Sequence, residues 1–173
     1  GNGIAVGYAS TNIIMETNFI HDYIVWFIDI STTSSYLSSN IVVGNSVLKN
    51  LYNYSGKYWS GELTDEKQNY SNEENPHQDG IFIRQPSASG PLKHVRIYNN
   101  TFVNDVDVTE DGGTAWLFCS QIVPTGSIHI YNNLFLNSYA NDHIALGFNQ
   151  ADGYTINVYH NTFAIRGGCV QIT

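Results

Sequence analysis

The chain has 173 residues and a formal net charge of −8, from 7 Lys and Arg against 15 Asp and Glu. This acidic balance argues against a nucleic-acid partner, because phosphate binding needs a basic face. The sequence contains no run of about 18 apolar residues, so it predicts no membrane span. A chain of 173 residues fits one domain over residues 1–173, and its 42% apolar residues can fill a core.

An internal repeat organises the chain. Clear copies lie at 94–102, 127–135 and 155–163, and fainter copies lie at 12–20 and 40–47. Each copy is a strand, a turn with asparagine, and a second strand. The aligned asparagines are Asn18, Asn45, Asn100, Asn133 and Asn161. We expect them to form a hydrogen-bonded ladder along a stack of strands.

A further short apolar strand precedes each copy. These strands are expected at 3–6, 23–26, 80–83, 113–116 and 143–146, and residues 168–170 begin a sixth. Apolar residues alternate at period two, and no sustained helical period is present. A unit of about 27 residues cannot bury its apolar face alone, but it can when stacked on its copies. The sequence therefore predicts a coil of parallel strands.

One interval breaks the regular spacing, because 55 residues separate Asn45 from Asn100. The extra residues, at about 50–79, form either a long loop or an irregular turn of the coil. Stacked repeats need polar caps on their terminal units. Neither end of this chain has one, so we expect a segment of a longer coil.

Two other residue types have defined places in the repeat. Tyr98, Tyr131 and Tyr159 share one position, which predicts an aromatic column at the edge of the coil. Cys119 and Cys169 should lie about two turns, or roughly 10 Å, apart, which is too far for a disulfide. We expect both to be free thiols in the core.

The pattern Ile/Val-x-x-Asn-x-Phe at 97–102, 130–135 and 158–163 resembles the repeat of right-handed parallel β-helix proteins of the pectate-lyase-like superfamily. This resemblance implies an all-β solenoid of about five to six turns. It also implies an extracellular or cell-surface enzyme that acts on a polysaccharide, as a glycoside hydrolase or a polysaccharide lyase. Because the same coil serves adhesins and fibres, a non-catalytic glycan-binding or structural segment is the alternative.

Acidic residues precede several of the expected strands. Asp22, Asp79 and Asp142 would form one column, with neighbouring turns about 5 Å apart. Such a column suits the paired carboxyl groups of a glycosidase, one with a raised pKa, and it would also suit Ca²⁺. Aspartate before glycine is equally a common turn residue.

The densest group of reactive side chains is His77, Asp79 and Arg84. His77 can exchange protons near neutral pH, Asp79 can orient it, and Arg84 can bind a carboxylate with two hydrogen bonds. A lyase would use His77 or Lys57 as its base and Arg84 or Ca²⁺ to neutralise charge, whereas a hydrolase would use the aspartates. The expected catalytic residues are His77, Asp79, Arg84 and Asp22.

Substrate would be held by the turns next to these residues and by the long excursion. His21 should stack near His77, and the side chains at 57–59 offer charge and aromatic surface to a sugar. The expected substrate-binding residues are His21, Lys57, Tyr58, Trp59, Asp142 and His143.

Overall fold

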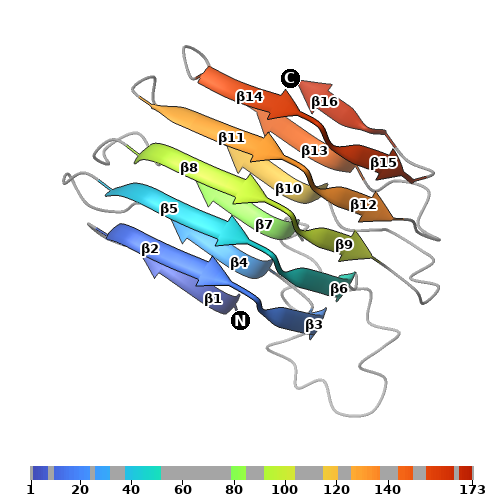
Figure 1. Cartoon of the computed structure of the whole chain (residues 1–173), viewed down its shortest axis with the longest axis horizontal. Coiled ribbons are helices and arrows are strands. Elements are labelled where there is room, and N and C mark those ends of the chain that lie inside the picture. Colours follow the sequence, from blue (N-terminus) through green and yellow to red (C-terminus); the bar gives the residue numbers. More distant parts are fainter. Residues whose placement is uncertain are drawn as a thin grey trace, which may run out of the picture.

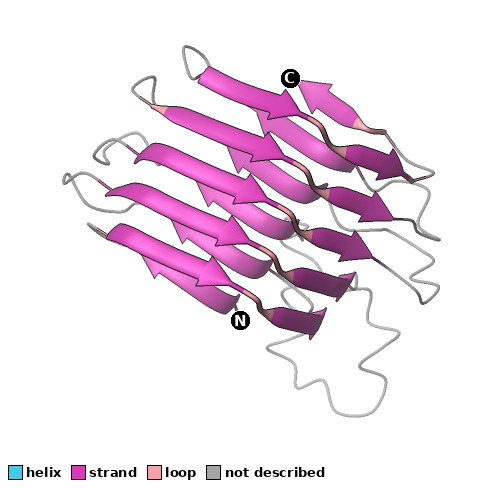
Figure 2. Ribbon diagram, viewed as in Figure 1, coloured by secondary structure: helices cyan, strands magenta, loops and turns pink. Residues whose placement is uncertain are grey.

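The computed structural model describes residues 2–7, 10–23, 26–31, 38–51, 79–84, 92–103, 115–120, 126–136, 144–149, 155–165 and 168–172. In these residues the fold is all-β and contains no helix. All strand pairs are parallel, and they build three sheets in which each strand neighbours the strands one coil turn before and after it (Figures 1 and 2). The prediction of stacked parallel strands is confirmed.

Sheet A lies behind the other two sheets in Figure 1. Its strands, in spatial order, are β1 (Asn2–Gly7), β4 (Trp26–Ser31), β7 (Asp79–Arg84), β10 (Ala115–Ser120), β13 (Ile144–Asn149) and β16 (Val170–Ile172). Four of these strands begin later than the sequence predicts, at Trp26, Ala115, Ile144 and Val170. The register explains the shift, because it aligns Ile28, Ile81, Leu117 and Leu146 in one inward column.

Sheets B and C lie in front and meet at a bend (Figure 1). Sheet B contains β2 (Thr11–Glu16), β5 (Ser38–Gly44), β8 (Leu92–Tyr98), β11 (Ser127–Tyr131) and β14 (Thr155–Tyr159). Sheet C contains β3 (Phe19–Tyr23), β6 (Val47–Leu51), β9 (Thr101–Val103), β12 (Leu134–Leu136) and β15 (Thr162–Ala164).

The core consists of columns of similar side chains, because every turn of the coil places the same repeat position above the last. Phe102, Phe135 and Phe163 stack with ring centroids 4.6 and 5.1 Å apart. Aliphatic side chains of sheets A and B fill the rest of the interior, and burial of each contributes about 1.5–3 kcal/mol. They include Ile28, Ile30, Ile81, Ile83, Val95, Ile97, Ile128 and Ile130.

Two adjacent columns form the turn between sheets B and C. The outer column adopts positive φ, with values from 50° to 57° at Thr17, Asn45, Asn99, Asn132 and His160. The inner column holds the ladder: Asn100 donates from its backbone and side chain to Asn133 Oδ1, and Asn133 donates likewise to Asn161 Oδ1, at 2.9–3.0 Å. The asparagine ladder is confirmed.

One ladder position was wrongly assigned from the sequence. Ser46 occupies the inner column, where its N–H donates to Asn100 Oδ1 at 3.0 Å, and Asn45 belongs to the outer column. Asparagine suits both places, since it tolerates the left-handed conformation and also pairs with other amides. The alignment on asparagine alone therefore chose the wrong neighbour.

The two cysteines are free, but only Cys119 is buried. The prediction that Cys169 is a core thiol is wrong: it is exposed, and no described strand packs over it beyond β16. Apart from its ends, the excursion at about 50–79 lies outside the described residues.

Candidate functional site

The outer face of sheet A brings together the polar side chains of β4 and β7. Trp26 aligns with Asp79, Asp29 with Phe82, and Ser31 with Arg84. The alternating residues Ile28, Ile30, Ile81 and Ile83 enter the core, whereas Trp26 and Phe82 pack with Phe118 in a separate cluster. These six outward residues, Trp26, Asp29, Ser31, Asp79, Phe82 and Arg84, are called the sheet A cluster below.

Arg84 is held from two sides. Its Nε donates to Ser31 Oγ at 3.0 Å, and Ser31 Oγ in turn donates to Asp29 Oδ1. The guanidinium carbon lies 5.5 Å from the ring centroids of both Trp26 and Phe82, which stack 4.9 Å apart. Among the described residues its two terminal nitrogens have no hydrogen-bond partner. The guanidinium is therefore oriented by the protein, half-buried, and able to bind an anion.

Asp79 is completely buried at the start of β7, the opposite end of the strand from Arg84. Its Oδ1 accepts the Ala115 N–H at 3.1 Å, and no group donates to its Oδ2. Burial raises the pKa of the carboxyl well above its usual range, although hydrogen bonds from Ala115 and the Trp26 side chain act in the opposite direction. The site thus favours a neutral carboxylic acid.

The predicted column of Asp22 and Asp79 does not form. Asp22 lies in β3 of sheet C and Asp79 in β7 of sheet A, because β4 begins at Trp26 and aligns that residue with Asp79. His21 lies in β3 as well, exposed, with its ring 4.9 Å from that of Phe19. The expected alignment of Asp22 with Asp79 is therefore wrong, and the expected stacking of His21 on His77 stays a prediction, because His77 lies outside the described residues.

Trp26 takes the place that the sequence assigned to Asp22, and the acidic residue of this strand is Asp29. It stands three positions along the strand from Trp26 and one strand from Asp79, which puts the two Cα atoms about 11 Å apart. Asp29 is 7% exposed and Asp79 is 0% exposed. Neither carboxyl group is open to a large substrate.

The described residues do not fit a Ca²⁺ site. They contain no group of three or more His, Cys, Asp or Glu side chains close enough to share a metal ion. The Asp22–Asp79 column that would supply the ligands is absent, because Trp26 and not Asp22 aligns with Asp79.

Six of the predicted site residues lie outside the described residues: Lys57, Tyr58, Trp59, His77, Asp142 and His143. Their roles stay predictions. Conversely, sequence reasoning missed Trp26, Asp29 and Ser31. The available signal was the repeated frame Ile-x-Ile, which places residues 26–31 in line with 79–84.

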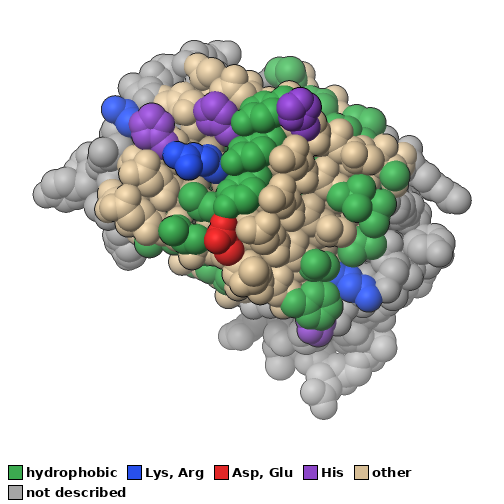
Figure 3. Space-filling model, viewed as in Figure 1, with side chains coloured by type: hydrophobic (Ala, Val, Ile, Leu, Met, Phe, Trp, Pro, Cys, Tyr) green, Lys and Arg blue, Asp and Glu red, His purple; other side chains and the backbone are tan. Residues whose placement is uncertain are grey.

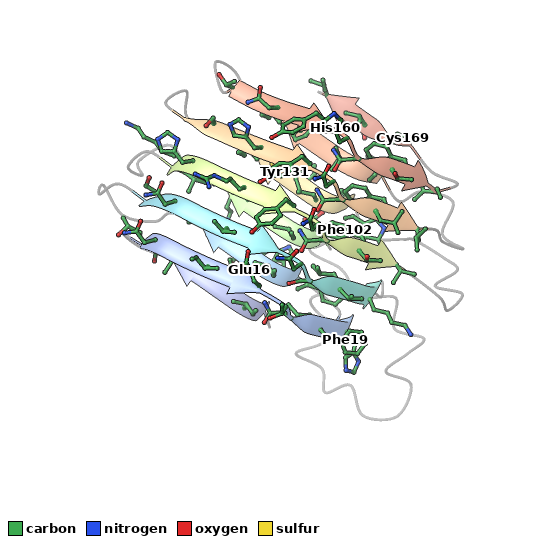
Figure 4. All side chains as sticks on the ribbon, in the orientation of Figure 1. Glu16, Phe19, Phe102, Tyr131, His160 and Cys169 are labelled. Atoms are coloured by element: carbon green, nitrogen blue, oxygen red, sulfur yellow. The ribbon has the colours of Figure 1, made fainter. Side chains whose placement is uncertain are left out.

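A second surface is the outer face of sheet B (Figure 3). The rings of Tyr98, Tyr131 and Tyr159 stack with centroids 5.3 and 5.0 Å apart and with angles of 9° and 2° between the ring planes. This stack confirms the predicted tyrosine column. At one end of the column the Tyr98 ring packs over Gly44, and its hydroxyl group donates a hydrogen bond to the Glu16 carboxylate. Figure 4 shows Glu16 and Tyr131 on this face.

Comparison of the chain with protein-family models, with curated proteins and with solved structures found no match. In the part of the chain that the structure describes, no helix has the length and hydrophobicity needed to span a membrane.

Proposed function

We propose that this protein is a polysaccharide-active enzyme of the right-handed, pectate-lyase-like β-helix type, acting outside the cell or at its surface. The observation that carries the proposal is Arg84, oriented on the outer face of sheet A by Ser31, Trp26 and Phe82. A guanidinium fixed in this way can bind a sugar carboxylate through two parallel hydrogen bonds.

The same arginine favours elimination over hydrolysis. Neutralising a uronate carboxylate makes the proton on the adjacent carbon easier to remove, and His77, two residues before Asp79, is the candidate base. A glycosidase instead needs two carboxyl groups at the scissile bond. Asp29 and Asp79 are both less than a tenth exposed. Asp29 positions Arg84 through Ser31, whereas Asp79 accepts the Ala115 N–H at the start of the neighbouring strand β10.

The test is activity on uronic-acid and neutral polysaccharides, with unsaturated product followed by absorbance and reducing ends measured in parallel. Arg84→Gln and His77→Ala should each lower formation of unsaturated product by about a hundredfold or more. Lys49→Gln, which removes a cation from sheet C, should not change the rate.

Two results would contradict this proposal, one about the reaction and one about Arg84. Reducing ends without unsaturated product would indicate hydrolysis. Equal rates for Arg84→Gln and wild type would remove Arg84 from the site.

A non-catalytic glycan-binding or structural segment is the second candidate, and it is favoured by the cover over Asp29 and Asp79. It predicts that folded protein binds glycan without forming either product, and that Asp79→Asn leaves binding unchanged.

A further inference from the structure

We infer that the outer face of sheet B is a separate binding surface for a carboxylated polysaccharide chain. The surface is formed by two parallel columns on β8, β11 and β14, together with the residues at their ends. It faces away from the sheet A cluster across the core of the coil, so the inference does not depend on the proposed enzymatic activity. We call it the sheet B surface: Lys93, His94, Arg96, Tyr98, His129, Tyr131, Asn157, Tyr159 and His160.

The first column supplies cationic and polar groups. Arg96 aligns with His129, and His129 aligns with Asn157 in the next strand. Arg96 is exposed, and neither a hydrogen bond nor an ion pair holds its guanidinium among the described residues. Lys93 and His94 extend this basic area towards the start of β8.

The second column is the tyrosine stack, two residues further along each strand. Its facing ring surfaces cover one another at 5.0–5.3 Å, so within the stack the accessible parts are the ring edges and hydroxyl groups. His129 and His160 approach Tyr159 edge-on, at 6.4 and 5.5 Å between ring centroids. This arrangement presents a row of hydroxyl groups beside the column of Arg96, His129 and Asn157, and Figure 3 shows Lys, Arg and His side chains next to a stripe of hydrophobic side chains on this face.

Charge on this face opposes the charge of the chain as a whole. The chain carries a formal net charge of −8. Among the described side chains on the outer face of sheet B, however, the single acidic residue is Glu16, whose carboxylate accepts a hydrogen bond from the Tyr98 hydroxyl group. A local basic strip on an acidic protein attracts an anionic ligand at short range.

The two columns select a polysaccharide over a nucleic acid. Single-stranded nucleic acids bind by stacking several bases on open aromatic faces. The facing sides of these three tyrosines are occupied by one another, the Tyr98 ring packs over Gly44, and only the outer side of Tyr159 has no described strand of sheet B beyond it. Lys93 and Arg96 are also too few to replace the counterions of a phosphate backbone. Hydroxyl edges and a few well-separated cations suit a chain with many hydroxyl groups and one carboxylate per sugar.

The spacing of the columns gives the direction of the bound chain. Successive side chains in each column lie about 4.8 Å apart along the coil axis, close to the length of one pyranose unit. A polysaccharide that runs parallel to the axis would therefore meet Arg96, His129 and the tyrosine hydroxyls in step. A chain that crosses the strands would meet one turn of the coil only.

The experiment measures binding of polygalacturonate by calorimetry in an Arg84→Gln background, so that cleavage and sheet A binding do not contribute. Arg96→Gln should weaken binding about tenfold, because a charge-assisted hydrogen bond is lost. Tyr131→Phe keeps the ring stack and should weaken binding about threefold through loss of the hydroxyl. Lys49→Gln, on the outer face of sheet C, is the charge-matched control and should bind within twofold of its parent.

Thermal unfolding of each variant checks that the fold is intact. Equal weakening by Arg96→Gln and Lys49→Gln would show general electrostatic attraction and overturn the inference. The inference is equally overturned if polygalacturonate does not bind, if a neutral galactan binds as tightly, or if single-stranded oligothymidylate binds more tightly in an Arg96-dependent way. Loss of enzymatic activity in Arg84→Gln with polygalacturonate binding preserved supports the two sites as independent.

Discussion

Truncation of the asparagine ladder at Asn133 should be among the most damaging single changes. Asn133 is 2% exposed. Asn133→Ala removes the acceptor of the Asn100 N–H and Asn100 Nδ2, each at 3.0 Å, and the donor to the Ile97 carbonyl at 2.9 Å. The Asn100 N–H and the Ile97 carbonyl then lack a partner, and Asn100 Nδ2 keeps only its hydrogen bond to the Val43 carbonyl. At about 1 kcal/mol for each of these three lost hydrogen bonds, we expect a loss of about 3 kcal/mol. That is a large fraction of the 5–15 kcal/mol typical of a folded domain.

Urea unfolding followed by circular dichroism measures this loss, with the slope compared between variants to verify that the same transition is observed. Asn161→Ala removes equivalent hydrogen bonds at a half-buried position, where water can replace them, and should lose about 1–2 kcal/mol. Asn132→Gly is the matched control: Asn132 is exposed with φ of 54°, a conformation that glycine adopts freely, and the change should cost less than about 1 kcal/mol. A loss under 1 kcal/mol for Asn133→Ala, or an equal loss for Asn132→Gly, would refute the ladder as a source of stability.

Further predictions concern Asp79 and two glycines. The raised pKa of Asp79 stabilises the fold fully below the ordinary aspartate pKa of about 4, and this stability is lost as pH rises through the higher folded-state pKa. Over that window stability should fall by up to about 1.4 kcal/mol per pH unit, and Asp79→Asn should abolish this slope in unfolding measured from pH 4 to 9; an unchanged slope would assign it to other groups. Gly80→Ala should cost about 3 kcal/mol or prevent folding, because its Cβ would lie 2.5 Å from the Trp116 carbonyl oxygen. Gly44→Ala should cost only about 1 kcal/mol, because the Tyr98 ring, 2.8 Å from the added Cβ, can rotate away from it. That rotation breaks the hydrogen bond to Glu16 that chiefly raises the pKa of Tyr98, so this pKa should fall in an ultraviolet titration. Equal costs for the two glycines, or an unchanged Tyr98 titration, would contradict these contacts.

The ladder and the tyrosine column were predictable because each depends on one repeated position. Asn100, Asn133 and Asn161 lie in nearly identical sequences, so equal spacing in the chain becomes vertical alignment in the coil. Asn45 was misplaced because its copy of the repeat is weak and two neighbouring columns accept asparagine.

The sheet A cluster was only partly predictable. Asp79 and Arg84 stand in a strand whose start the sequence marks clearly, and a carboxyl group with a raised pKa was anticipated there. Their partners Asp29 and Ser31 come from a strand about 50 residues earlier, across the long excursion. The Ile-x-Ile frame connects these strands, but the predicted start shifted the first of them by four residues, so that Asp22 instead of Trp26 was aligned with Asp79.

The sequence by itself determined that this protein is a stack of parallel strands, because a strand-length repeat with alternating apolar residues can bury its core only against its own copies. It also determined which repeat positions form polar and aromatic columns. Tertiary structure alone decided which residues meet across the turns of the coil. A shift of one residue in register exchanges the inner and outer faces of a strand, and register depends on the packing of distant strands. For this reason the pairing of Asp29, Ser31 and Arg84, the burial of Asp79 and the basic strip beside the tyrosines became evident only in the folded chain.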